Sequence, residues 1–138
     1  ESQNDNTVAE NQLMQNRIGV ILPLSFLIGG DGMVFEINGV KWSVVSVAPS
    51  SDCLRRSDGS FTVGVTDNTT HCICLSNRLV GGFKRKVLIH ELCHAVCMSY
   101  NIHIPLEQEE FLCDFVATYG DEVFDMVDMM VGEIRKTA

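Results

Sequence analysis

The chain has 138 residues, of which 46% are hydrophobic and 20% charged, and its formal net charge is −8. This length and apolar content suffice for one globular domain with its own core. The negative charge argues against nucleic acid or membrane surfaces as partners, and the most apolar run, residues 18–28, is too short to cross a bilayer and is broken by Pro23. We expect a soluble chain that is not exported.

Residues 1–32 are expected to form an N-terminal extension, partly disordered or packed on a domain of residues 33–138. The first 16 residues are polar and rich in Asn and Gln, with a short surface helix expected over residues 8–15. The apolar run that follows, residues 18–28, fits either a buried strand or a helix segment. The glycines after it then predict a turn.

The next segments have the composition of β-strands. Residues 34–37 and 41–47 flank Asn38-Gly39, the strongest short signal for a β-hairpin. Residues 61–66 and 71–75 predict two more strands joined by a polar turn.

Six cysteines are present: Cys53, Cys72, Cys74, Cys93, Cys97 and Cys113. Cys93 and Cys97 lie four residues apart in a helical pattern, a spacing that rarely satisfies disulfide geometry. Cys72 and Cys74 form a Cys-x-Cys pair, but a structural zinc site needs four ligands and the chain has no second such pair. We expect free thiols and a reducing, cytoplasmic compartment.

From Phe83 onward the apolar residues recur at helical spacing. Val87, Leu88 and Leu92 mark the buried side of a first helix. Pro105 suits the start of a second helix, and Gly120-Asp121 predicts its end and the cap of a third. The predicted fold class is α+β, a small antiparallel β-sheet packed against about three helices.

The first helix carries the pattern HExxH. His90 and His94 are one turn apart on one face, so their imidazoles can converge on a single Zn²⁺. Glu91 emerges beside them, where it can act as general base toward a metal-activated water without being a ligand. The alternative is that both histidines are ordinary residues at the edge of the core.

A catalytic zinc site needs a third protein ligand, and the second helix offers several acids. Glu110 is the best candidate, because Asp114 lies one turn later on its face and can accept a hydrogen bond from a ligand imidazole. Glu109 points about a quarter-turn away, and Glu107 lies near the helix start. For these two we prefer the interpretation of a solvated helix N-terminus, although a neighbouring acid remains an alternative to Glu110.

A peptidase site also benefits from a donor to the developing oxyanion. The sequence offers His71, Tyr100, His103 and Tyr119 as candidates for oxyanion or substrate contacts, each with a structural role as the plainer alternative.

Residues 87–96 and 110–117 together resemble the small gluzincins of the ImmA/IrrE type and their shorter relatives encoded by phages. The resemblance covers residues 33–119, including the hairpin and strand pair. In the larger members the downstream helix has Ala and Asn where this chain has Cys113 and Asp114. The resemblance implies a zincin-like fold and one Zn²⁺ held by His, His and Glu. It also implies hydrolysis of peptide bonds in a protein or peptide substrate, in the cytoplasm of a bacterial or phage-infected cell. In zincins the strand before the active-site helix commonly forms the edge along which a peptide lies, so we expect this of residues 71–75. The alternative is a non-catalytic metal-binding module of phage or bacterial origin, with a regulatory or interaction role.

Overall fold

The computed structural model describes residues 22–23 and 32–137. The elements in chain order are β1 (Leu22–Pro23), β2 (Gly32–Ile37), β3 (Val40–Val47), the short 3-10 helix η2 (Asp52–Leu54), β4 (Gly64–Asp67), β5 (Cys72–Ser76), α2 (Gly81–Ser99) and α3 (Leu106–Thr137). The α+β class is confirmed. The helix expected over residues 8–15, and most of the run 18–28, lie outside the described residues.

Strands β2 and β3 form the predicted hairpin. Asn38 and Gly39 have φ values of 50° and 77°, the left-handed conformation that a two-residue hairpin turn requires. The hairpin is tied to the end of α2, because the buried Trp42 donates from its Nε1 to Ser99 Oγ at 2.7 Å. This bond satisfies the indole N–H inside the core.

The sheet is mixed rather than antiparallel, which corrects the prediction. Its strand order is β1-β2-β3-β5-β4, and β5 pairs parallel to β3 and antiparallel to β4. The chain runs from β3 through η2 to the far edge before a tight β4–β5 turn brings it back. β5 is therefore inserted between β3 and β4, and β4 rather than β5 is the edge strand.

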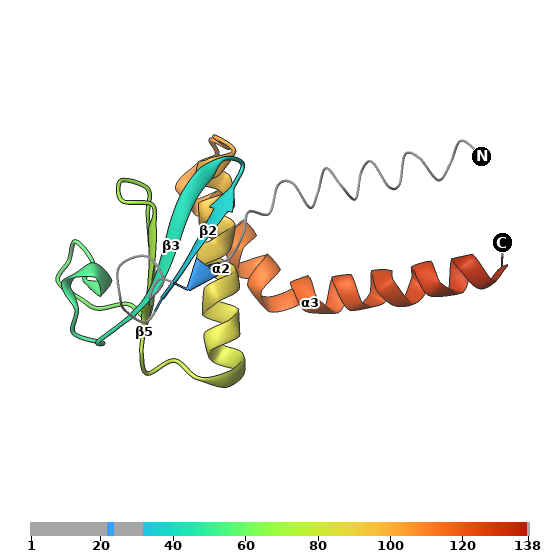
Figure 1. Cartoon of the computed structure of the whole chain (residues 1–138), viewed down its shortest axis with the longest axis horizontal. Helices are drawn as coiled ribbons and strands as arrows, with labels where there is room; N and C mark the ends of the chain where they lie inside the picture. The colour runs from blue at the N-terminus through green and yellow to red at the C-terminus, as the bar shows by residue number, and fades with distance from the viewer. Residues whose placement is uncertain (1–21, 24–31, 138) are drawn as a thin grey trace.

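One face of the sheet is covered by α2 (Figure 1). The core between them consists of Trp42, Ile73, Leu75, Leu79 and Ala95, with Val87, Leu88 and Leu92 of α2 packed against it. Burial of these side chains fixes the rotation of α2 about its axis, so its other faces are available for α3 and for a site. No helix in the described part of the chain is long and apolar enough to span a membrane.

The expected third helix is also corrected, since the described residues contain only two α-helices. α3 continues without interruption through Gly120 and Asp121 to Thr137. A glycine inside a helix costs only about 1 kcal/mol, which the surrounding turns can offset. Asp121 does not cap a new helix, because its carboxylate accepts two hydrogen bonds from Arg85 of α2, at 2.8 and 2.9 Å.

Candidate metal centre

The two histidines of the HExxH pattern converge as predicted. Both lie on α2, and their Nε2 atoms are 3.1 Å apart. The rings meet edge to face, with centroids 4.8 Å apart. One turn of helix therefore directs both nitrogen lone pairs to the same point in space.

Glu110 of α3 supplies the third donor. Its Oε2 lies 3.2 Å from His90 Nε2, and its Oε1 lies 3.1 Å from His94 Nε2. The donor atoms of His90, His94 and Glu110 all lie within 4.8 Å of one another. Two imidazole nitrogens and a carboxylate around one point form a group that could hold a metal ion.

Each imidazole is oriented from behind by a second carboxylate. Asp114 Oδ1 lies 2.8 Å from His90 Nδ1, and Glu109 Oε2 lies 2.7 Å from His94 Nδ1. A carboxylate on Nδ1 fixes the tautomer that leaves Nε2 free to bind a metal. Asp114 occupies the predicted place. Glu109 does not belong to a solvated helix N-terminus as we expected, whereas Glu107 is exposed there.

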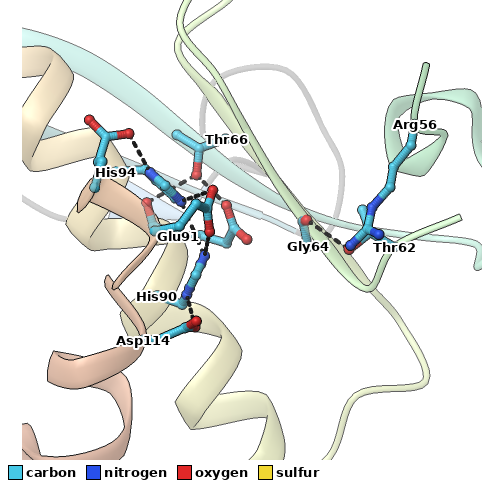
Figure 2. A network of polar contacts seen from close by, with 10 residues as sticks. Arg56, Thr62, Gly64, Thr66, His90, Glu91, His94 and Asp114 are labelled. Atoms are coloured by element: carbon cyan, nitrogen blue, oxygen red, sulfur yellow. Dashed lines mark hydrogen bonds and ion pairs between the residues drawn. The ribbon is translucent and has the colours of Figure 1, made fainter. Parts of the chain in front are cut away.

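Glu91 is buried next to the donor group and is not part of it. Thr66 Oγ1 of β4 lies 2.5 Å from Glu91 Oε2 and 3.0 Å from the Glu91 carbonyl oxygen, and its one proton can be donated to either (Figure 2). A buried carboxylate beside the donor group, but not part of it, is suited to proton transfer.

Gly64 allows β4 to approach α2 this closely. A Cβ at this position would lie 2.8 Å from Val87 Cγ1 and 3.1 Å from both Cγ and Oε1 of Glu91. Any side chain here would therefore push β4 away from Glu91. The sequence contained no local pattern that marks Gly64 or Thr66, because their role depends on the packing of a strand against a helix.

Two cavities open on either side of this contact between β4 and α2. The first, about 310 Å³, is lined by the three donor residues together with Glu91, Glu109, Thr66 and Arg56. The second, about 220 Å³, is lined by His90, Glu91 and Asp114 together with Phe83 and Lys86. Gly64 and Thr62 border both cavities.

The four candidates for oxyanion or substrate contacts are not brought to the donor group. His71 stacks on Trp42, with ring centroids 4.9 Å apart. Tyr119 lies against Phe115 at 5.3 Å on α3. Neither these two nor Tyr100 and His103 line the two cavities at the site.

All six cysteines are free thiols. Three of them, Cys93, Cys97 and Cys113, lie between α2 and α3 beside the donor group. Burial raises the pKa of each of these thiols, and the Glu109 carboxylate raises the pKa of Cys97 further. They are therefore protonated at neutral pH and act as small apolar packing groups.

No protein-family model matches the chain, and no curated protein or solved structure is significantly similar to it.

Proposed function

We propose that the chain is a zinc-dependent metallopeptidase, related to the small gluzincins, that hydrolyses peptide bonds with Glu91 as general base. The observation that carries the proposal is the convergence of His90 Nε2, His94 Nε2 and the Glu110 carboxylate, with Glu91 beside them but outside the donor set. A purely structural metal site has no use for such a carboxylate.

Zinc fits these donors best. Two imidazoles and one carboxylate make up a common set of protein ligands in catalytic zinc sites, which leave a fourth position open. A structural site would more often supply four protein ligands, several of them thiolates. When bound, zinc supplies Lewis acidity, which polarises a substrate carbonyl and lowers the pKa of water at the open position.

Glu91 would take the proton from the attacking water and pass it to the leaving amine. Its burial, with 7% of its surface exposed, keeps the carboxylate from being fully solvated. Thr66 Oγ1 lies 2.5 Å from one carboxylate oxygen, Oε2, and can hold it by donating its proton. This arrangement orients the base before substrate arrives, which reduces the reorganisation that the reaction requires.

An extended peptide would bind along β4. Among the described strands, β4 pairs only with β5, so the backbone groups on its other side could pair with a peptide. The two cavities meet at Gly64, opposite Glu91, so side chains on either side of the scissile bond would occupy one cavity each. This revises our expectation that residues 71–75 are the edge.

The test is Glu91→Gln in the full chain. Elemental analysis should find one zinc per chain in both the wild type and the variant, because Glu91 is not a donor. Hydrolysis of a peptide library, read by mass spectrometry, should fall by roughly a hundredfold or more, the contribution expected of a general base. Glu107→Gln, which changes an exposed acid at the start of α3, is the control and should keep full activity.

Two outcomes would contradict the proposal. If Glu91→Gln cleaves peptides as fast as the wild type, Glu91 is not the base. If the zinc-loaded wild type cleaves no member of the library, the alternative of a non-catalytic metal-binding module is favoured.

A further inference from the structure

The face of α2 that carries the two histidines continues toward the start of the helix with apolar residues. Phe83, Val87, His90 and His94 recur at alternating intervals of four and three residues, which places all four along one face. Phe83 lies in the first turn of α2, immediately before three basic residues, and is 60% exposed. A large aromatic side chain therefore lies in line with the metal donors but outside the core.

The facing side of α3 continues past its own donor in the same direction. The two helices run antiparallel, because Arg85 near the start of α2 contacts Asp121, well beyond Glu110 on α3. Ala117 follows Glu110 by two helical turns and shares its face of α3. Ala117 and Phe83 both line the second cavity. The small side chain of Ala117 leaves room there for another group.

The second cavity has apolar walls and extends to the place where β4 approaches Glu91. Four of its lining residues are apolar side chains, from both helices and from the segment before β4: Val63, Phe83, Val87 and Ala117. Gly64 also lines the cavity, and it is the residue of β4 that lies against Glu91. A volume of about 220 Å³ is smaller than that of most ligand sites and suits a single side chain.

We propose that the second cavity binds a large apolar side chain of the substrate, next to the bond that is cleaved, and that Phe83 determines this specificity. The inference rests on the proposed peptidase function, since it places the side chain beside the bond on which Glu91 would act. An aliphatic or aromatic side chain in the cavity would remove apolar surface from water, both its own and that of the exposed Phe83.

A charged side chain is matched less well to this cavity. Apart from His90, its titratable lining residues are Lys86, Glu91 and Asp114, which carry charges of both signs. Asp114 is already paired with His90 at 2.8 Å, and Thr66 lies within hydrogen-bond distance of Glu91. An acidic side chain would meet both carboxylates, and a basic one would meet Lys86, so each would lose hydration beside a like charge.

Binding of amino-acid hydroxamates to the zinc-loaded chain tests the inference without hydrolysis. A hydroxamate chelates zinc and presents its side chain to the adjoining cavities. Calorimetric titration should show phenylalanine hydroxamate binding at least roughly tenfold tighter than glycine hydroxamate, the effect expected of an apolar side chain in a matching pocket. In Phe83→Ala this ratio should fall below about threefold, since part of the apolar wall is lost.

Phe111→Ala is the matched control for Phe83→Ala. It makes the same change at a phenylalanine of α3 that is 72% exposed and lines neither cavity at the site, so the ratio should stay at its wild-type value. Ala117→Leu gives a second test by filling the cavity, and leucine is also a good helix former. It should weaken phenylalanine hydroxamate more than glycine hydroxamate. Zinc content is the folding check, because none of these residues is a donor.

The outcomes separate this inference from the proposed function. If both hydroxamates bind the zinc-loaded wild type equally, or if their ratio is unchanged in Phe83→Ala, the inference is overturned and the proposed function still stands. Tighter binding of glutamate or lysine hydroxamate than of the phenylalanine compound would also overturn it. A wild type that binds no zinc would instead overturn the proposed function, and the inference with it.

Discussion

The two histidines of the candidate metal centre are held by similar bonds in different surroundings. On the His94 side, the side chains of His94 and Glu109 are only 8% and 14% exposed. On the His90 side, His90 is 19% exposed and Asp114 is 70% exposed. The two carboxylate–imidazole distances, 2.7 and 2.8 Å, are nearly equal. Distance alone therefore does not rank the two contacts.

The difference in exposure indicates that the side chains around His94 are held more rigidly than those around His90. A charge-assisted hydrogen bond strengthens where the local dielectric is low, and water competes with it where the acceptor is exposed. We expect Glu109 to orient its imidazole more firmly than Asp114 does. The buried side, which borders the first cavity, would hold the ion more firmly than the exposed side, which borders the second.

The largest effect is expected from removing the ligands themselves. His94→Ala and His90→Ala should each abolish binding of one zinc per chain, and with it the rise in melting temperature that zinc causes. The metal-free proteins should differ, because His94→Ala leaves the Glu109 carboxylate buried without its partner. Urea unfolding in a chelator should show His94→Ala to be less stable than His90→Ala by about 1–3 kcal/mol. Equal stability of the two metal-free variants would mean that the His94 and His90 sides do not differ in this way.

The next effect concerns the outer carboxylates. Glu109→Gln should weaken zinc affinity by roughly 10- to 100-fold, as loss of a partner behind a ligand imidazole commonly does. Asp114→Asn should weaken it by less than about tenfold, because water can replace an exposed acceptor. Competition with a chromophoric chelator measures both affinities. A larger loss for Asp114→Asn would reverse our ranking of the two sides.

Local helical spacing made most of the candidate metal centre predictable from sequence. His90, Glu91 and His94 follow from one helical turn, and Glu110 with Asp114 follows from a second. The contact of Glu109 with His94 was not predicted, because Glu109 lies a quarter-turn from Glu110 and its contacts depend on how α3 is placed against α2. The placement of two helices relative to each other is a tertiary property that neither pattern contains.

The fold shows the same division between local and long-range information. The hairpin at Asn38-Gly39 was predictable because two adjacent residues determine the turn. The parallel β3–β5 pairing was not, because it joins strands separated by η2 and β4. The break expected at Gly120 gave too much weight to a single glycine, whose cost the rest of a 32-residue helix offsets.

Gly64 borders both cavities. A change at Gly64 should therefore affect the His94 side and the His90 side equally. Gly64→Ala should destabilise the chain by about 1–3 kcal/mol, because the new Cβ would overlap Val87 and Glu91. Hydrolysis should fall through displacement of Glu91, while zinc affinity stays near that of the wild type. Gly82→Ala, at an open position in the first turn of α2, is the control. A large loss of zinc affinity in Gly64→Ala would mean that β4 also supports the histidines.

The smallest effect is a difference in thiol reactivity that reports the burial of the His94 side. Cys97 is 3% exposed and interacts with Glu109, and both burial and that carboxylate raise its pKa. Alkylation requires the thiolate, so iodoacetamide at neutral pH should modify the exposed Cys53 at least about tenfold faster than Cys97. Mass spectrometry of timed samples gives both rates, and unfolding should make them similar. Glu109→Gln should speed the reaction of Cys97 without changing that of Cys53, because it removes a negative charge that acts on Cys97 and not on Cys53. An unchanged Cys97 rate in this variant would mean that the Glu109 charge is not felt at the thiol.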